Sequence, residues 1–297
     1  MNPGVSMEVA PTRVIEAALK LALDELDLPA TLKEAMAYAT LGGGKRLRPM
    51  LCWHSAAAMG APGACSLPAG IAVEFVHAFS LIHDDLPAMD DDDLRRGKPT
   101  LHIHAGEAMA ILAGDALEAA SFAALVGPAV PKGCVAELLR ELSAGTLGMI
   151  GGQVLDTLGT PGVVSPQDAL EAIHRSKTGA LIVAACRMGA ILGLAHGGRT
   201  MLGFELGAIT AYAKAIGLMF QIVDDLIDVE QPAEAAGKRT GKDAAAGKLT
   251  YPSIHGVQAS REAIQRLHAE ALQAVGPLGP AASGLVSLAE VLSARTS

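Results

Sequence analysis

The chain has 297 residues, of which 51% are hydrophobic and 18% charged, and its formal net charge is −8. This length and apolar content allow a large buried core, and the negative charge argues against nucleic acid as the main partner. Aromatic residues make up only 3%, which leaves little material for β-sheets. The four cysteines form no CxxC pair, so we interpret them as thiols in a reducing compartment.

The chain begins with MNPGVSMEVAPTR, a stretch without the apolar segment of a secretory signal peptide. Its most apolar stretches, GALIVAACRMGAILGLA and AITAYAKAIGLMFQIV, are interrupted by Arg187 and Lys214. Both charges come before the ~18 apolar residues that a membrane span needs. We therefore expect a cytoplasmic protein without a membrane span.

Apolar residues recur with helical spacing along the whole chain. In the first segment, residues 12–27, one helical face carries Ile15, Leu19 and Leu26. Further helices are predicted at 46–59, 66–86, 105–126, 131–151, 166–196, 202–230 and 253–274. Glycine and proline cluster between these segments, and there is no alternating strand pattern, linker composition or repeat. The sequence predicts a single all-α domain over residues 1–297, a bundle larger than four helices.

The stretch HDDLPAMDDDD, residues 83–93, places six aspartates in eleven positions directly after an apolar run. One interpretation is a solvated acidic loop, the usual environment of charge runs. The other is a site for hard divalent cations, which take oxygen ligands. Because Pro87 disfavours helical geometry, we expect the helix to end or bulge here and Asp90 to return beside Asp84. This motif alone leaves both interpretations open.

A second acidic motif occurs in MFQIVDDLIDV, residues 219–229. On a helix, Asp224 and Asp228 share one face and Asp225 lies beside them. Carboxylates surrounded by isoleucine, valine and leucine make a poor solvated surface but a good wall for metal ions. Two such motifs facing each other across a bundle predict a magnesium site with a strongly anionic ligand beyond it.

Basic residues accompany both acidic motifs. Each of them alone would be interpreted as an ordinary surface charge. Grouped around two acidic sites in an acidic protein, they indicate clamps for diphosphate groups. The set consists of Lys45, Arg48, Arg95, Arg96, Lys177, Lys238, Lys242 and Lys248.

Together, these motifs make the sequence resemble the trans-prenyl diphosphate synthases, specifically the bacterial short-chain type such as farnesyl diphosphate synthase. The resemblance runs through GGKRLRP, HDDLPAMDDDDLRRGKPT, GGQVLD, KTGAL, FQIVDDLID and GKLTYP, in consistent order. It implies an all-α bundle around a deep central cavity, the isoprenoid synthase fold, with Mg²⁺ as cofactor. It also implies a homodimer that uses isopentenyl diphosphate and allylic diphosphates.

The resemblance further implies roles for individual residues. A magnesium cluster on the allylic diphosphate would be held by Asp84, Asp85, Asp90, Asp224, Asp225 and Asp228. The same diphosphate would be bound by Arg95, Lys177, Thr178, Gln221, Lys238 and Lys248. The pocket for isopentenyl diphosphate would be formed by Lys45, Arg48, His77 and Arg96. Without the resemblance, the histidine would be interpreted as a core residue. The main catalytic groups would be Asp84, Asp85, Asp90, Arg95, Lys177, Asp224 and Asp225.

Two other classes of protein share part of this pattern. A class I terpene cyclase typically pairs the first motif with an Asn/Ser/Glu-type second motif and has no isopentenyl pocket, whereas here the second motif is again DDxxD. A catalytically silent subunit of a prenyl synthase heteromer would have lost aspartates or arginines, and this chain keeps them. Glu118 stands where an apolar or neutral residue is expected, and nothing in the resemblance explains it.

The length of the product is predicted from the helix that leads into the first motif. Phe79 lies five residues before Asp84, about 7–8 Å lower along a helix axis. In the resembling bacterial enzymes, this position contributes to the floor of the cavity, and Ser80 lies beside it. A phenyl ring there favours the C15 product, farnesyl diphosphate, over the C10 and C20 products. The alternative is that Phe79 is simply a packed core residue.

Overall fold

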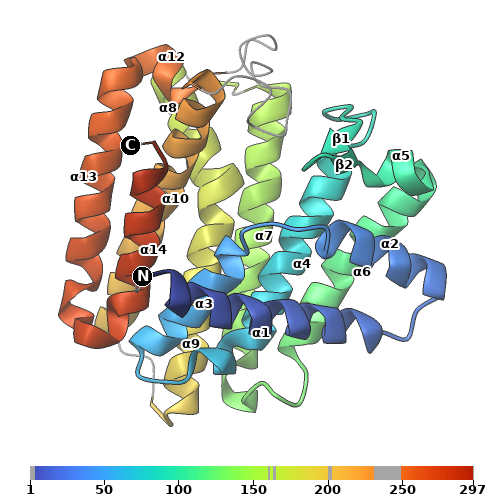
Figure 1. Cartoon of the computed structure of the whole chain (residues 1–297), viewed down its shortest axis with the longest axis horizontal. Helices are drawn as coiled ribbons and strands as arrows, with labels where there is room; N and C mark the ends of the chain where they lie inside the picture. The colour runs from blue at the N-terminus through green and yellow to red at the C-terminus, as the bar shows by residue number, and fades with distance from the viewer. Residues whose placement is uncertain (1–3, 160, 163–164, 200–202, 231–248, 297) are drawn as a thin grey trace.

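The computed structural model describes residues 4–159, 161–162, 165–199, 203–230 and 249–296 (Figure 1). The longer helices among these residues form one bundle. They are α1 (Gly4–Asp24), α2 (Ala30–Thr40), α3 (Leu47–Ala58), α4 (Leu67–Asp84), α6 (Glu107–Leu125), α7 (Val135–Leu158), α8 (Pro166–Ile173), α9 (Ala180–His196), α10 (Gly203–Glu230), α13 (Val257–Val275) and α14 (Ser283–Ser293). Short helices are α5 (Leu101–Ala105), α12 (Tyr251–His255), η1 (Gly63–Ser66), η2 (Lys132–Cys134), η3 (His174–Gly179), η4 (Gly276–Ala282) and η5 (Ala294–Thr296). The all-α prediction is confirmed.

The closest helix pairs are α4 with α6, α3 with α9, α10 with α13 and α7 with α9, so α9 is surrounded by other helices (Figure 1). Apart from Arg187 and the terminal His196, this helix consists of apolar residues and glycine, which is the pattern of a buried helix. Glycines allow it to approach α3 closely. A Cβ on Gly189 would lie 2.2 Å from the carbonyl oxygen of Cys52, and one on Gly193 would lie 2.8 Å from that of Ala56.

Several predicted boundaries need correction. The prediction for 166–196 was one helix, but the chain there forms α8, the π-helical turn η3 and α9. α7 continues to Leu158, past the predicted end at 151. Two helices, α2 and α14, lie outside the predicted segments, and a hairpin of two-residue strands, β1 (Leu94–Arg95) and β2 (Lys98–Pro99), follows α4. The helices α2 and α14 and the hairpin are short, so their sequences contain too few residues for a clear hydrophobic periodicity.

Five helical stretches of the described chain are long and apolar enough to cross a membrane, by length and composition alone. They are Gly63–Asp84, Glu107–Leu125, Pro166–His196, Gly203–Val229 and Val257–Ser293. The interruptions at Arg187 and Lys214 therefore do not bring the stretches that contain them below this limit. In the bundle, the most apolar part of Pro166–His196 is 78% buried against other helices, which gives its composition a packing role.

Candidate active site

The first acidic motif begins where α4 ends. Asp84 is the last residue of that helix, and the chain then turns back, because the amide of Asp90 donates to the carbonyl of Asp84 (2.8 Å). The amide of Asp92 donates in the same way to the carbonyl of Asp85 (3.2 Å). The predicted return of Asp90 to Asp84 is therefore confirmed for the backbone, and Asp90 itself is exposed to solvent.

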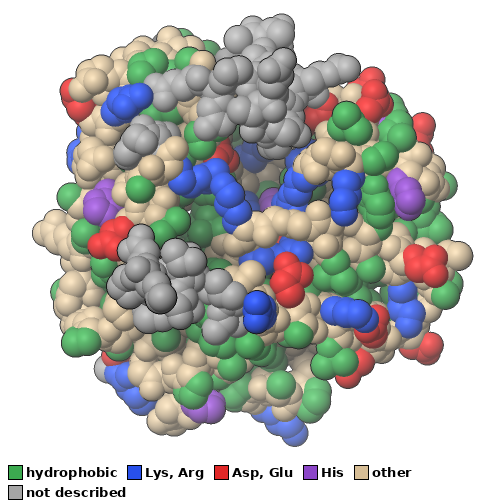
Figure 2. Space-filling model, viewed as in Figure 1, with side chains coloured by type: hydrophobic (Ala, Val, Ile, Leu, Met, Phe, Trp, Pro, Cys, Tyr) green, Lys and Arg blue, Asp and Glu red, His purple; other side chains and the backbone are tan. Residues whose placement is uncertain are grey.

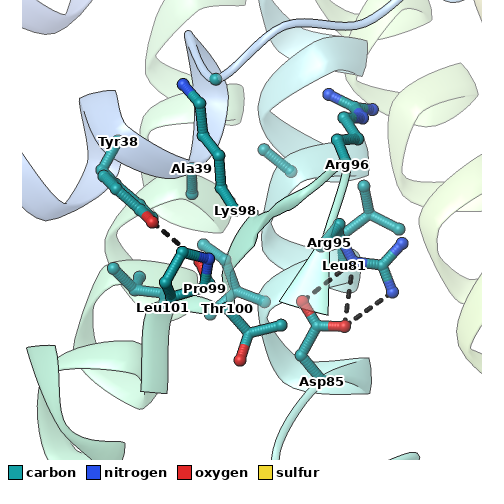
Figure 3. A pocket seen from close by; sticks show the side chains of 13 residues that line it. Tyr38, Ala39, Leu81, Asp85, Arg95, Arg96, Lys98, Pro99, Thr100 and Leu101 are labelled. Atoms are coloured by element: carbon teal, nitrogen blue, oxygen red, sulfur yellow. Dashed lines mark hydrogen bonds and ion pairs between the residues drawn. The ribbon is translucent and has the colours of Figure 1, made fainter. Parts of the chain in front are cut away.

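The arginine pair lies on the hairpin that follows. Arg96 and Gly97 form its turn with φ angles of 53° and 74°, and left-handed geometry at both central residues is typical of tight two-residue hairpins. The turn separates the two arginines. Arg95 donates to Asp85, whereas Arg96 donates through Nη1 to the carbonyl of Gly43. The hydroxyl of Tyr38 donates to Pro99 (2.8 Å) and ties the hairpin to α2, beside a small pocket (Figure 3).

Asp85 has a structural partner. Arg95 donates from Nε to both carboxylate oxygens (2.9 Å each) and from Nη2 to Oδ1 (2.7 Å) (Figure 3). The Asp85 side chain is only 4% exposed. In this conformation the two groups satisfy each other, and neither is directed at a separate ion or diphosphate. This differs from the roles that the resemblance implies, in which Asp85 binds Mg²⁺ and Arg95 binds the allylic diphosphate.

Asp84 has a different environment. Its pKa is raised to about 6, mainly by burial and also by the charges of Asp90 and Asp85, although Lys177 and Arg95 act in the opposite direction. This carboxylate is therefore costly to keep ionised, and an additional cation beside it would stabilise its charged form.

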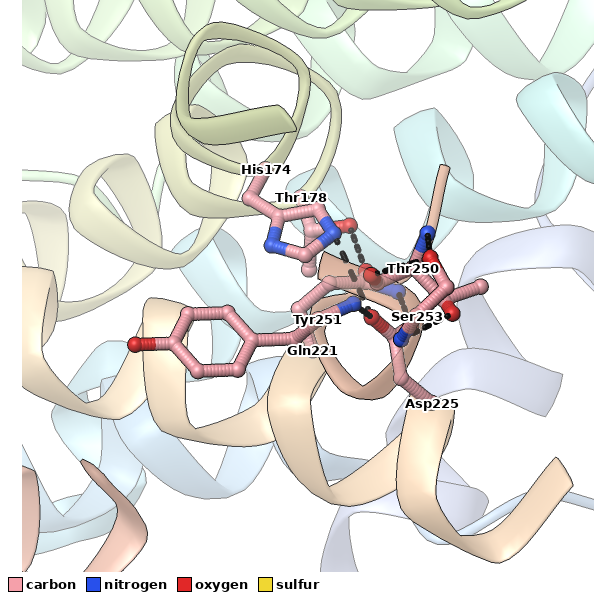
Figure 4. Close-up of polar contacts among 7 residues, drawn as sticks. All are labelled: His174, Thr178, Gln221, Asp225, Thr250, Tyr251 and Ser253. Carbon is pink, nitrogen blue, oxygen red and sulfur yellow. Dashed lines mark hydrogen bonds and ion pairs between the residues drawn. The ribbon is translucent and has the colours of Figure 1, made fainter. Parts of the chain in front are cut away.

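The second acidic motif lies on α10, and its middle residue is also committed to structure (Figure 4). Asp225 accepts from Nε2 of Gln221 (3.0 Å) and from the amide of Tyr251 (2.8 Å). Nε2 of His174 lies 3.6 Å from the same carboxylate. Asp225 is 4% exposed. It joins α10 to the first turn of α12, which also has a capping box between Thr250 and Ser253.

Asp224 and Asp228 are partly exposed on the same helix. Nη1 of Arg295, in the C-terminal turn η5, lies 3.6 Å from Oδ1 of Asp224. Asp224 also raises the pKa of Lys45, which burial and the charge of Arg295 lower more strongly. Asp224 therefore faces basic groups from the two ends of the chain. Arg295 could not be singled out from the sequence, because the C-terminal segment resembles the family only as a generic helix.

Lys177 lies in the π-helical turn η3, and such turns occur frequently at functional sites. Its ammonium donates to Asp156 of α7 (2.6 Å). The contact depends on close packing, since a Cβ on Gly152 would lie 2.1 Å from the Lys177 amide nitrogen. The neighbouring Thr178 donates to the side chain of Gln221 (2.9 Å). Asp156 was not singled out as a functional residue, although GGQVLD was among the resembling motifs.

The four residues predicted for the isopentenyl pocket come from α3, α4 and the loops beside them. Burial lowers the pKa values of Arg48 and Arg96, and partial desolvation lowers that of the otherwise exposed Lys45. The pKa of His77 is well below its usual value because of burial and the charges of Arg48 and Arg96. These cations therefore lie close enough to interact, and an anion among them would relieve their repulsion. Figure 2 shows basic side chains around a hollow in one face of the molecule.

The remaining residues singled out from the sequence are a group of lysines, the residues predicted for the cavity floor, and Glu118. Lys238, Lys242 and Lys248 lie outside the described residues. Phe79 is 6% exposed, and its ring contacts that of His83 edge to face at 5.8 Å between centroids. The Ser80 hydroxyl donates to the carbonyl of His77 (2.9 Å). Glu118 is partly exposed on α6, and nothing in its surroundings explains its charge.

The donor chemistry of the two motifs fits Mg²⁺. The described residues contain no group of three acidic, histidine or cysteine side chains that could by itself hold an ion. Mg²⁺, however, is usually bound by one or two carboxylates, with water and substrate phosphates completing its octahedron. Four carboxylates are suited to that role. They are Asp84, whose pKa is raised mainly by burial, the exposed Asp90, and the partly exposed Asp224 and Asp228.

Comparison with known proteins gives a family. The model of the polyprenyl synthetase family matches residues 29–275. The chain belongs to the polyprenyl synthetase family. It is 44% identical over 293 residues to geranylgeranyl pyrophosphate synthase 11 of Arabidopsis thaliana, covering 95% of this chain and 79% of that protein. It is 43% identical over 288 residues to a probable farnesyl diphosphate synthase of Bradyrhizobium diazoefficiens, covering 96% and 86%.

The fold agrees with this membership. The crystal structure of a geranyltransferase from Legionella pneumophila superposes with a TM-score of 0.84 at 31% identity, covering 99% of this chain and 97% of that one. The fold is the isoprenoid synthase fold, and the protein is a trans-prenyl diphosphate synthase. The resemblance inferred from the motifs is confirmed at this level. The names of the relatives divide between farnesyl and geranylgeranyl diphosphate synthases.

Proposed function

We propose that this enzyme condenses isopentenyl diphosphate head to tail with dimethylallyl and then geranyl diphosphate, and releases farnesyl diphosphate. The observation that carries the C15 product is the buried ring of Phe79, five residues before Asp84 on α4. A growing prenyl tail that starts beside Asp84 and follows α4 into the bundle would meet this ring. Geranyl and geranylgeranyl diphosphate are the alternative products.

In the proposed reaction, Lys177, Thr178 and Gln221 bind the allylic diphosphate, together with Lys238 and Lys248. Mg²⁺, held by Asp84, Asp90, Asp224 and Asp228 from the two motifs, would supply Lewis-acid stabilisation of the departing pyrophosphate. Asp85 and Asp225 support these carboxylates from behind, through Arg95 and α12. The site proposed for the allylic diphosphate is thus built on the end of α4, on α10 and on η3, and η3 packs against α10.

Lys45, Arg48, His77 and Arg96 would hold isopentenyl diphosphate with its double bond near the allylic carbon. The allylic C–O bond breaks, the double bond of isopentenyl diphosphate forms the new C–C bond, and the pyrophosphate takes the proton that is lost. No protein nucleophile is needed. The apolar side chains of the bundle keep water away from the carbocation.

A homodimer is supported by an apolar stripe on α7. Leu147, Ile150, Val154 and Leu158 recur at helical spacing and are 67%, 42%, 49% and 79% exposed. We propose that a second copy of the chain covers this stripe. Leu147→Asp should then convert a dimer to a monomer in light scattering. A wild-type monomer at micromolar concentration would contradict the proposal.

The cysteines agree with the proposed cytoplasmic location, because all four are free.

A catalytically silent subunit is the main alternative from another class. The purified protein alone, given isopentenyl diphosphate, an allylic diphosphate and Mg²⁺, separates the two. The silent subunit would form no prenyl product under these conditions.

The product length is tested with Phe79→Ala. If Phe79 forms the floor, the product shifts towards C20 or longer, because the tail gains room. If it is only a core residue, the variant loses roughly 3–5 kcal/mol of stability and still makes C15. Leu267→Ala on α13, a helix that packs against α10, is the matched control for lost core volume. Melting temperature and product distribution are measured on both variants.

A further inference from the structure

A buried ion-pair cluster lies behind the proposed isopentenyl pocket. Its centre is Arg46, which precedes α3 and is 3% exposed. Nε donates to Oε1 of Glu16 on α1 (2.6 Å), and Nη1 donates to Oε1 of Glu74 on α4 (2.6 Å). One side chain therefore connects three helices.

The backbone of Arg46 also has an uncommon geometry. Its φ angle is 49°, in the left-handed region that non-glycine residues rarely adopt. Such a conformation persists where the surroundings fix it, and here the two carboxylates hold the side chain inside the bundle. Lys45, the preceding residue, is exposed, and Arg48 follows two residues later. The geometry of Arg46 thus decides the direction in which these two predicted ligand-binding residues leave the loop.

Glu74 acts on more than Arg46. Its negative charge also raises the pKa values of Arg48 and Arg96, which burial lowers. It is 5% exposed and lies three residues before His77, hence one helical turn away on α4. Among the described residues, buried donor atoms without a hydrogen-bond partner include Nη2 of Arg46 and Nε of Arg48. Glu74 therefore supplies a buried negative charge to a group of arginines, and two of these, Arg46 and Arg48, have donor atoms without a hydrogen-bond partner.

We infer that Glu74 is a positioning residue for the isopentenyl diphosphate pocket, which it organises by holding Arg46 and thereby the loop of Lys45 and Arg48. Glu74 itself lies behind the pocket and acts through the arginines. This inference rests on the proposed function, because it takes the isopentenyl pocket as given. A buried ion pair that served only stability would affect binding of the two substrates equally.

The chain offers a matched control for that alternative. Arg187 of α9 donates to both carboxylate oxygens of Glu141 on α7 (2.8 and 2.7 Å), and the Glu141 side chain is 15% exposed. This pair also joins helices, and its hydrogen bonds reach none of the predicted substrate residues that the structure describes. Glu141→Gln therefore reports what the loss of a largely buried pair costs without a positioning role.

The test is steady-state kinetics with each substrate varied in turn. In Glu74→Gln we expect the KM for isopentenyl diphosphate to rise at least tenfold, while the KM for the allylic diphosphate stays within twofold. In Glu141→Gln both KM values should stay within twofold, although the melting temperature falls. Equal changes of the two KM values in Glu74→Gln, or an unchanged KM for isopentenyl diphosphate, would overturn the inference.

Two more variants show whether Glu74 acts through Arg46. In a cycle with Arg46→Met, the effects on the KM for isopentenyl diphosphate should not add, because both variants release the same loop. Full additivity would overturn that route. If Glu74→Gln does not fold, Glu16→Gln provides a second test, because it removes the more exposed partner of Arg46. This variant should raise the KM for isopentenyl diphosphate severalfold. An unchanged KM in Glu16→Gln would overturn the route through Arg46. Failure of the wild type to condense isopentenyl diphosphate would instead contradict the proposed function.

Discussion

The two aspartate motifs lie in different local structures, but in both of them the two adjacent carboxylates have different surroundings. In the first motif, Asp84 faces Lys177 electrostatically while Asp85 is buried against Arg95. In the second, Asp224 faces Lys45 and Arg295 while Asp225 is buried against Gln221 and the amide of Tyr251. Each adjacent pair thus has one carboxylate directed at charged groups of the site and one that supports the structure.

The difference between the two regions lies in what the buried carboxylate holds. Asp85 lies just after the end of α4 and fixes a side chain of the hairpin that follows. Asp225 lies inside α10, five residues before its end, and fixes the backbone of α12, which comes after residues 231–248. A DDxxD sequence therefore identifies a carboxylate pair but leaves open which member binds a ligand. The neighbours in the fold decide that.

The largest effect should follow from neutralising the first member of each pair. In Asp84→Asn or Asp224→Asn we expect kcat to fall at least roughly a hundredfold, because carboxylates that hold Mg²⁺ support several kcal/mol of charge stabilisation. The fold should persist, which circular dichroism can verify. Turnover near the wild-type rate at saturating Mg²⁺ in both variants would remove these residues from the metal site.

The second members should respond mainly in stability. Asp85→Asn leaves the charge of Arg95 without its partner and should cost about 2–3 kcal/mol of unfolding free energy, somewhat less than a fully buried pair because Arg95 is 23% exposed. Chemical denaturation measures this change. If Asp84→Asn destabilised the protein as much as Asp85→Asn, the proposed division within the pair would be wrong.

A smaller, local effect should distinguish Asp225 from Asp85. In Asp225→Ala the amide of Tyr251 loses its acceptor, so its hydrogen exchange should accelerate at least tenfold. Asp85→Asn serves as the control, because its contacts are with the hairpin, and should leave that amide protected. Unchanged exchange at Tyr251 in Asp225→Ala would show that α12 is held by its capping box instead.

The bundle, both motifs and the family could be predicted from the sequence, because long apolar periods and short charged motifs are local patterns. The sequence also predicted the return of Asp90 to Asp84, because Pro87 has a known steric effect. It could not give the roles of Asp85 and Asp225, whose partners depend on how the hairpin and α12 pack. Arg46 was missed for a related reason: no sequence pattern indicates its positive φ angle, and its partners Glu16 and Glu74 lie on two other helices, α1 and α4.

The last expected effect is a pair of opposite pH dependences, one in each region. In the metal-free protein the pKa of Asp84 is raised to about 6, so the folded state binds a proton more tightly than the unfolded state, and stability falls as pH rises from about 4 to 6. The pKa of His174, beside Asp225, is lowered by burial to about 4, so the unfolded state binds the proton more tightly and stability is lost as pH falls below about 6.5. Over the same pH range the two contributions oppose each other.

Variants separate the two contributions. Unfolding free energies are measured by denaturation in EDTA from pH 4 to 6.5, and each variant is subtracted from the wild type at the same pH. The Asp84→Asn protein should become more stable relative to the wild type as pH rises, and the His174→Gln protein less stable, each by on the order of 2–3 kcal/mol. Added Mg²⁺ should reduce the advantage of Asp84→Asn at pH 6.5, because only the wild type keeps that carboxylate for the ion. The two difference curves should slope in opposite directions with pH. If both slope in the same direction, one of the two buried groups has been assigned the wrong charge state, and the curve with the unexpected slope identifies that group.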